Sequence, residues 1–238
     1  MKKYFLPFIT LAVTAFLISS CFLNIVEPSG EYISKDYNVR SFENISVSAG
    51  MEVILTQDTT TSVRIETYEN LFDYLIVKVV NNTLVLTKNV EVLFKNPRIK
   101  VYVNVDYLEK IVASSGSKLD LTSGWIADDL DIEMSSGSSA MGTLVLNELN
   151  LTLSSGSSAK FEGVADDLNV EASSGSSFRG LDVNVLNGRV FLYSASYAEI
   201  NASETLYVEG FEASIVRYKG APDITIKTSS GASVIKLP

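Results

Sequence analysis

The chain of 238 residues contains no histidine and a single cysteine, Cys21. The absence of histidine excludes Ser-His-Asp and Cys-His nucleophilic sites and any metal site built on imidazole. One cysteine cannot form a disulfide within the chain, and no GxxxxGK[ST] segment is present to bind nucleotide phosphates. The commonest catalytic and nucleotide-binding arrangements are therefore missing.

Basic residues are also scarce. The chain has 19 lysines and arginines against 28 acidic residues, a formal charge of −9. Loss of residues 1–20 would remove two lysines and no acid, leaving 17 basic residues and a charge of −11. Such a surface is unsuited to nucleic acid or to electrostatic docking on anionic lipid, so we expect no nucleic-acid partner.

Long hydrophobic runs are limited to the N-terminus. Lys2 and Lys3 precede an apolar run from Tyr4 to Ile18, which is too short to span a membrane comfortably and is typical of a secretory signal. The run ends in "LISSC", which resembles the lipobox of bacterial lipoproteins and predicts lipidation of Cys21 after removal of residues 1–20. The alternative is a buried free cysteine. We expect an exported protein of the cell envelope, an outer-membrane lipoprotein on the periplasmic or surface face, with residues 21–35 as a tether.

Internal repetition is the main positive feature. Similar segments, which we call Ser-Gly words, recur along the chain, for example "IVASSGSKLDL", "IEMSSGSSAMG" and "LTLSSGSSAKF". The last seven copies of a small marker residue follow one another at intervals of 21, 19, 19, 20, 18 and 18 residues, a period typical of solenoids. The marker residues are Gly50, Gly116, Gly137, Gly156, Gly175, Ala195, Ala213 and Gly231.

Two apolar columns accompany the marker. The position five before it is always aliphatic, as at Ile132, Leu151 and Val170, and the position three after it is never polar, as at Ala159 and Phe178. Between them apolar and polar residues alternate with the period of a strand. Leucine-rich repeats share the repeat length, but their fixed Leu and Asn frame is absent. Strands that recur without helices between them predict an all-β protein, a parallel β-helix of about 20 residues per rung.

The serines beside the marker have the same parity as the two apolar columns. We therefore expect the serines before it, such as Ser174, and after it, such as Ser176, to point inward at a narrow corner and to pass hydrogen bonds from hydroxyl to hydroxyl. Glycine suits a corner that needs an unusual φ or lacks space for a Cβ. This interpretation is favoured over a flexible linker.

The region before the regular rungs differs. "YLIVKVVNNTLVLTK" contains two apolar strands around Asn81 and Asn82, which tolerate the positive φ of a tight hairpin. We therefore expect a β-helix domain over residues 36–238, with N-terminal rungs and a β-hairpin elaboration over 36–107 and regular rungs over 108–238.

These motifs resemble a known family. "FENISVSAGMEVILTQ", "IKVYVNVDYLEKIVASSGS" and the repeated Ser-Gly words are similar to the putative auto-transporter adhesins with a head GIN domain, exported proteins of Bacteroidetes type, over roughly residues 36 to 237. The resemblance implies a right-handed, single-stranded β-helix and supports a lipoprotein signal. It implies no catalytic residue. This chain departs from the pattern at Ala195 and Ala213.

Carboxylates supply the candidate metal ligands. Asp129, Glu148 and Asp167 stand eight residues before successive markers, so stacking would align oxygens that suit Ca²⁺. The alternative is an ordinary turn in which Asp bonds local backbone. Parallel β-helix polysaccharide lyases use carboxylate-bound Ca²⁺ with an Arg or Lys base, but because the ordinary turn explains these aspartates we expect no enzyme and no obligatory cofactor. A serine nucleophile is not expected either, because the serines recur in every rung rather than at one singular place.

The last candidate is a contact surface. Aromatic and aliphatic residues replace serines and acids at outward positions of two atypical rungs, which suggests a contact with carbohydrate or protein. The alternative is that the N-terminal hairpin or another loop covers these residues, or that they stack on one another across rungs. The residues are Phe191, Tyr193, Tyr197, Tyr207, Phe211 and Ile215.

The sequence thus predicts a lipid-anchored envelope protein that acts as a non-enzymatic, adhesin-like or scaffold binding module. Its membrane contact would be the lipid on Cys21. The alternative is a Ca²⁺-dependent protein that binds or degrades polysaccharide. Neither the ligand nor the oligomeric state is indicated.

Overall fold

The computed structural model describes residues 24–238. The predicted signal peptide and the predicted lipidation site at Cys21 lie outside the described residues. Within residues 24–238, no helix combines the length and apolar character needed to cross a membrane.

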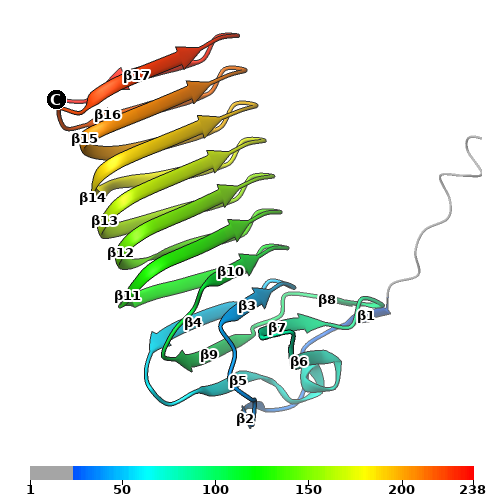
Figure 1. Ribbon diagram of the computed structural model, residues 1–238. Coiled ribbons are helices and arrows are strands. Elements are labelled where there is room, and N and C mark those ends of the chain that lie inside the picture. The colour runs from blue at the N-terminus through cyan, green and yellow to red at the C-terminus, as the bar shows by residue number, and fades with distance from the viewer. Residues whose placement is uncertain (1–23) are drawn as a thin grey trace, which may run out of the picture.

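The greater part of the described chain is one right-handed parallel β-solenoid (Figure 1). The regular part of the coil begins at β10 (Lys110–Ala113), and each later strand pairs in parallel with the equivalent strand of the preceding rung. The full rungs are β11 (Lys118–Met134), β12 (Ser139–Leu153), β13 (Ser158–Ala172), β14 (Ser177–Leu192) and β15 (Tyr197–Gly210). The last rungs divide into β16 (Ile215–Lys219), β17 (Asp223–Thr228) and β18 (Ser233–Lys236).

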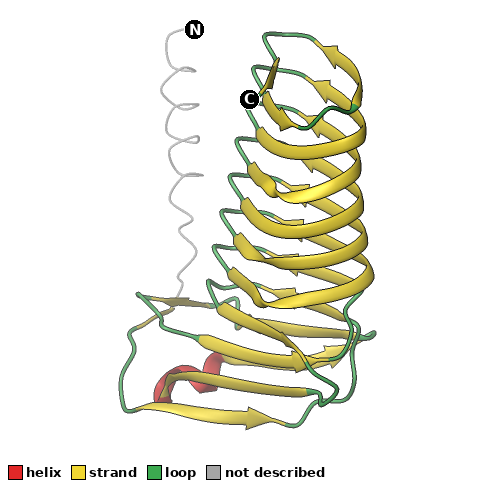
Figure 2. Ribbon diagram, turned by 90° about the vertical axis from the view of Figure 1, so that its left-hand side faces the viewer, coloured by secondary structure: helices red, strands yellow, loops and turns green. Residues whose placement is uncertain are grey.

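Each full rung is a single strand that wraps around the core and forms two walls (Figure 2). The half of the strand after the Ser-Gly turn pairs along one wall, which we call the rear wall; β15 meets β16 there. The half before the next turn forms the other wall, which we call the front wall; β15 meets β17 there. The front wall faces the viewer in Figure 1.

The two apolar columns are confirmed. On the front wall Ile132 pairs with Leu151, Leu151 with Val170, and Val170 with Val190, and all four are buried. On the rear wall Ala159 pairs with Phe178, and Phe178 is fully buried. Equivalent residues therefore stack between the walls, where each buried Val, Leu or Ile contributes about 1.5–3 kcal/mol by the area rule.

The Ser-Gly words form the turns that join the two walls. In each turn the serine before the marker and the marker itself have positive φ, for example 54° at Ser174 and 71° at Gly175. The backbone N–H of Ser176 closes the turn on the carbonyl of Ser173 at 3.2 Å, which defines a type I′ turn. Turns also bond to each other, since the N–H of Gly175 donates to the carbonyl of Ser194 in the next rung at 3.0 Å.

This geometry corrects the expected serine ladders. The serine before the marker occupies a central position of the turn and is exposed, as Ser174 shows, so only the serine after the marker points inward. The six serines after the marker are buried. The Ser176 hydroxyl bonds backbone rather than another hydroxyl: its one hydrogen is shared between the carbonyl of Leu153 in the preceding rung, at 3.0 Å, and that of Ser173, at 2.6 Å.

The N-terminal region closes the lower end of the coil. β3 (Asn44–Val47) and β4 (Glu52–Gln57) form the first rung and pair with β10 and β11. The predicted hairpin is present as β6 (Leu75–Val80) and β7 (Thr83–Lys88), turning at Asn81 and Asn82, and β7 pairs with β3. β9 (Lys100–Val105) pairs with β4 and with β5 (Ser62–Tyr68), and a 3-10 helix, η1 (Glu69–Tyr74), follows β5.

The predicted tether is partly wrong. Within residues 24–35 the chain forms β1 (Asn24–Val26), which pairs with β8 (Val92–Phe94), and most of β2 (Tyr32–Tyr37), which pairs antiparallel with β5. Their partners are distant in sequence, so no local periodicity reveals them. Residues 21–23 of the tether lie outside the described part of the chain.

Candidate functional site

Two outward rows on the front wall carry the polar side chains of the candidate site. The register places the predicted acidic column in one row, because Asp129 pairs with Glu148 and Glu148 with Asp167. The row continues through Asn187 and Thr205, and it ends at Asp223. The second row, two residues later in each rung, holds Asp131, Asn150, Asn169, Arg189, Tyr207 and Thr225.

Hydrogen bonds fix part of these rows. The side-chain amide of Asn150 donates to Asp131 at 3.0 Å, and that of Asn169 donates to Asn150 at 2.9 Å and to Glu148 at 3.0 Å. The Thr205 hydroxyl bonds Asn187 Oδ1 at 2.7 Å. These contacts follow the solenoid axis, so the rung spacing orients each amide.

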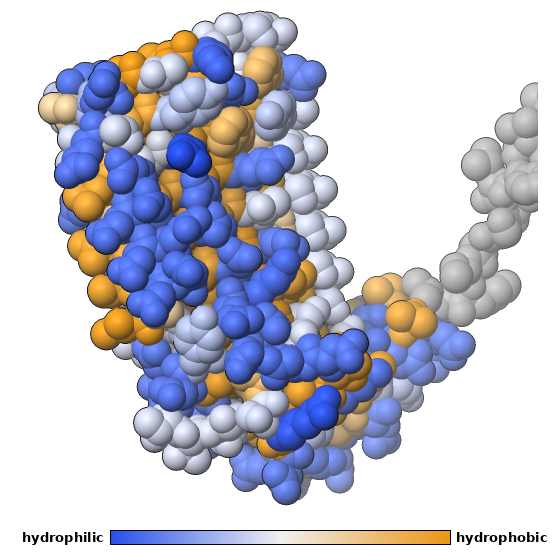
Figure 3. Space-filling view, viewed as in Figure 1, coloured by the Kyte–Doolittle hydropathy of each residue, from blue (hydrophilic) through white to orange (hydrophobic). Residues whose placement is uncertain are grey.

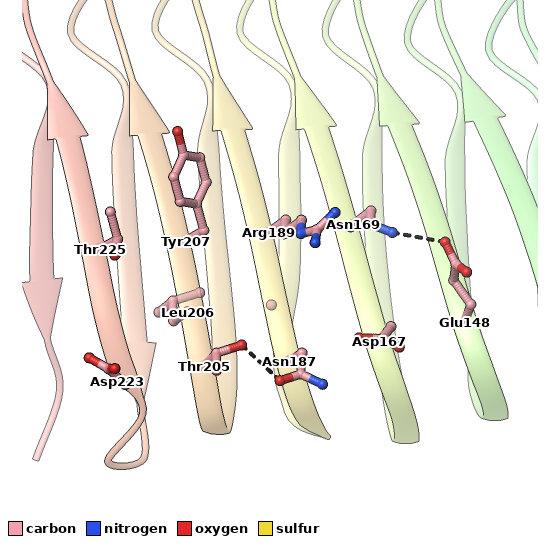
Figure 4. Close-up of a pocket in the computed structure, with 11 residues that line it drawn as sticks. Glu148, Asp167, Asn169, Asn187, Arg189, Thr205, Leu206, Tyr207, Asp223 and Thr225 are labelled. Carbon is pink, nitrogen blue, oxygen red and sulfur yellow. Dashed lines mark hydrogen bonds between the residues drawn. The ribbon is translucent and has the colours of Figure 1, made fainter.

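Between the rows lies a groove of about 450 Å³ (Figure 4). It extends from Glu148 on β12 to Asp223 and Thr225 on β17, with Asp167 on β13 and Arg189 on β14 between them. Gly188 also lines the groove. No larger residue fits there, because Ile200 and Leu206 fill the space that a side chain would need: a Cβ would be 2.6 Å from Ile200 Cδ1.

Asp129, Glu148 and Asp167, the predicted Ca²⁺ ligands, are brought into line but do not converge. Among residues 24–238, no group of three acidic or cysteine side chains is arranged to hold a metal ion. Glu148 is instead engaged by Asn169. Calcium binding at these residues stays a prediction.

The six residues predicted as a contact surface divide between the two walls. Phe191 and Tyr207 lie in β14 and β15 on the front wall, and Tyr193 and Phe211 stand at the turn end of this wall as the first residues of the turns that follow these strands. Tyr197 and Ile215 follow the turns and pair with one another on the rear wall. The four front residues are half-buried, as is Tyr197, and Ile215 is 37% exposed.

The front aromatics form two pairs across rungs. Tyr193 and Phe211 are stacked with ring centroids 5.3 Å apart and an interplanar angle of 6°, and Phe191 and Tyr207 lie 5.8 Å apart. Cross-rung stacking is therefore present. Cover by the hairpin is not, since β6 and β7 lie at the opposite end of the solenoid (Figure 1).

A charged cluster holds Tyr207 at the groove. Its hydroxyl donates to Glu209, and the Lys227 ammonium lies 2.6 Å from that hydroxyl and 3.2 Å from Glu209. The hydrogen bond from Tyr207 and then that from Lys227 lower the pKa of Glu209. The hydrogen bonds of Lys227 to Tyr207 and then to Glu209 raise the pKa of Lys227. On the rear wall, burial and then the Glu199 carboxylate raise the pKa of Tyr197.

Sequence reasoning missed Arg189 and Asn169 as site residues. Both stand two residues after members of the acidic row and share its outward parity. That parity was the available signal, because outward residues at i and i+2 of a strand are neighbours on one wall.

The fold and this face define a parallel β-solenoid protein with an exposed polar groove on one wall. The family model described as "putative auto-transporter adhesin, head GIN domain" matches residues 41–222, and the chain belongs to that family. No curated protein matches the chain.

Solved structures share the fold. A putative adhesin from Bacteroides fragilis is 20% identical with a TM-score of 0.82, covering 89% of this chain and all of its own. A putative adhesin from Parabacteroides merdae is 15% identical with a TM-score of 0.75, covering 90% of this chain and all of its own. A putative lipid binding protein from Parabacteroides distasonis is 16% identical with a TM-score of 0.71 and the same coverage. At these identities the likeness concerns the fold.

Proposed function

We propose that the protein is an adhesin-like binding module of the cell envelope, held to a membrane by lipid on Cys21, whose front wall contacts its target. Membership of a family described as adhesins supports an exported, envelope role. The observation that carries the proposal is the front wall itself, where a polar groove and two aromatic pairs stand in fixed register on one rigid coil.

No catalytic machinery enters this proposal. The chain has no histidine, and the Ser-Gly words repeat the same structural positions in rung after rung: Ser174 is a central residue of its turn, and Ser176 is a buried donor to backbone carbonyls. A rigid wall with half-buried aromatic rings and solvated polar groups suits recognition, since such rings supply contact area at low entropic cost.

Adhesion can be tested on bacteria that carry the full chain. Attachment to immobilised glycans, matrix proteins and host cells would be compared for wild type, Tyr193→Ala with Phe211→Ala on the front wall, and Tyr197→Ala with Ile215→Ala on the rear wall. We expect the front double variant to lose attachment and the rear one to retain it. Unchanged attachment by the front double variant, with its fold intact by circular dichroism, would refute the proposed contact wall.

The lipid anchor has its own test. Cys21→Ser should abolish incorporation of labelled palmitate and shift the protein from the membrane fraction to the soluble fraction, because Cys21 is the only cysteine. A variant that still carries label would contradict the proposal.

A second candidate is the Ca²⁺-dependent polysaccharide protein, favoured by the in-register row of Asp129, Glu148 and Asp167. Calorimetric titration with Ca²⁺ and melting with and without EGTA test it. Heat of binding that is lost in Asp167→Asn would support this function. No heat, together with an unchanged melting temperature, would remove it and any lyase activity that depends on the ion.

A further inference from the structure

We infer that the front-wall groove binds a neutral polysaccharide chain lying along the solenoid axis, an inference that rests on the proposed binding function. The first step is shape. The groove crosses β12, β13, β14, β15 and β17, which is four rung steps of about 4.8 Å, or about 19 Å. An open trough of this length fits an extended polymer better than a single compact molecule.

The lining determines the chemical class of the ligand. Apart from Gly188 and Leu206, every lining residue carries a side chain that can hydrogen-bond. The carboxylates accept, Arg189 donates, and the amides and hydroxyls do both. A ligand dense in hydroxyl groups can satisfy such a mixture, because each hydroxyl both donates and accepts. A lipid or other apolar ligand would leave these groups without partners, which is costly.

Several lining groups are available to a ligand. Among the side chains that line the groove, hydrogen bonds join only Asn169 to Glu148 and Thr205 to Asn187 (Figure 4). Figure 4 shows no hydrogen bond from Arg189, Asp167 or Asp223 to another residue of the groove, and Arg189 is exposed. The engaged residues therefore supply oriented amides, while Arg189 and the two aspartates are free to bond.

Tyr207 completes the edge of the groove nearest the turns. Its ring is in contact with the Phe191 ring, with centroids 5.8 Å apart, and the Lys227 ammonium lies 5.0 Å from the ring centroid. The ring is thereby held in place and offers an apolar boundary to the C–H surface of a sugar, while the polar rows bond the hydroxyl groups.

Charge distinguishes neutral from acidic chains. Glu148, Asp167 and Asp223 contribute three negative charges to the groove against one positive charge from Arg189. The space-filling view shows the front wall covered largely by hydrophilic side chains (Figure 3). An acidic polysaccharide or a nucleic acid would be repelled, so a neutral chain is favoured.

Affinity electrophoresis of the full-length chain in detergent tests this inference. Gels would contain galactomannan, xylan or mixed-linkage β-glucan, with polygalacturonate as the acidic counterpart. We expect at least one neutral polymer to retard the protein and polygalacturonate to have no effect. Arg189→Ala and Asp167→Ala should each lower the affinity for the polymer, obtained from the retardation, about tenfold. This is the loss expected for one hydrogen bond to a charged group.

Lys160→Ala and Arg179→Ala are matched controls, because both residues are exposed and pair with one another on the rear wall. Retardation by none of the neutral polymers, stronger retardation by polygalacturonate, or groove variants that behave as wild type would overturn the inference. If whole-cell attachment were nevertheless lost in the front aromatic variant, the proposed function would stand without this ligand. If the front aromatic variant also attached as well as wild type, the proposed function would fail together with this ligand.

Discussion

The left-handed turns allow a sharp test of the backbone geometry, through reciprocal exchange of glycine and alanine. Gly175 has φ of 71° and no atom within 4 Å of the place that a Cβ would occupy. Ala195 holds the equivalent position in the next rung with φ of 58°. The only native-state penalty for alanine at this position is therefore conformational.

The magnitude follows from two opposing contributions. A non-glycine residue in the left-handed region costs about 1–2 kcal/mol, and alanine recovers about 0.4–1 kcal/mol by restricting the unfolded chain. Gly175→Ala should thus destabilise the protein by about 1 kcal/mol, and Ala195→Gly should stabilise it by a similar amount.

Gly163 provides the contrast. Its φ is 121°, and a Cβ there would lie 2.0 Å from the carbonyl oxygen of Leu144. Because backbone would have to move, we expect Gly163→Ala to cost about 3 kcal/mol or more, the upper range for overpacking. Urea unfolding followed by circular dichroism measures all three differences. Equal costs for Gly175→Ala and Gly163→Ala, or a destabilising Ala195→Gly, would refute the reasoning.

Three further predictions concern other parts of the coil. Ser176→Ala should cost about 0.5–1.5 kcal/mol in urea unfolding, because the carbonyls of Leu153 and Ser173 each keep a backbone donor when the hydroxyl is lost; a cost above this range would contradict that account. Trp125 is fully buried, and its Nε1–H has no partner in the described structure. Trp125→Phe should therefore change stability by about 1 kcal/mol or less, since removal of the unpaired donor offsets lost packing, whereas Trp125→Ala should cost about 3–5 kcal/mol. Tyr207→Phe should raise the pKa of Glu209 toward its ordinary value in an NMR titration. Because that pKa is lowered in the folded protein, its stabilising contribution exists above the unfolded-state pKa and is lost as the pH falls through the folded-state value; a pKa unaffected by Tyr207→Phe would contradict the assigned cause.

The solenoid could be predicted from the sequence because each rung repeats one simple constraint. Parallel pairing places Ile132, Leu151 and Val170 over one another, so the same aliphatic type recurs at the same offset. The Asn81-Asn82 hairpin could be predicted equally well, because its turn has two successive positive φ values and therefore needs residues that tolerate them.

The corner could be predicted only in part. Counting parity through Ser174, Gly175 and Ser176 assumes a continuous strand, whereas the type I′ turn reverses the chain and exposes Ser174. For the same reason the aromatic set was expected on one surface but lies on two walls: Tyr193 and Tyr197 stand on opposite sides of a turn.

The groove could not be predicted from the sequence. Its floor depends on Gly188, which makes room for Ile200 of the next rung, and the pairing of β14 with β15 shifts register between Gly180 and Asn184. Such irregularities decide where a wall is hollowed, and they leave no periodic signal. The sequence could place Asp167 in a row but could not show that Arg189 shares a groove with it.

The central claim is that equivalent residues of successive rungs stand in line along one axis. Pulsed electron-electron double resonance in a Cys21→Ser chain tests it most directly. One spin label would be placed on Asp129→Cys and the other on either Thr205→Cys or Asp223→Cys. The account predicts separations of about 19 and 24 Å, four and five rung steps of about 4.8 Å. Separations that do not increase by about one rung between the two pairs would contradict it.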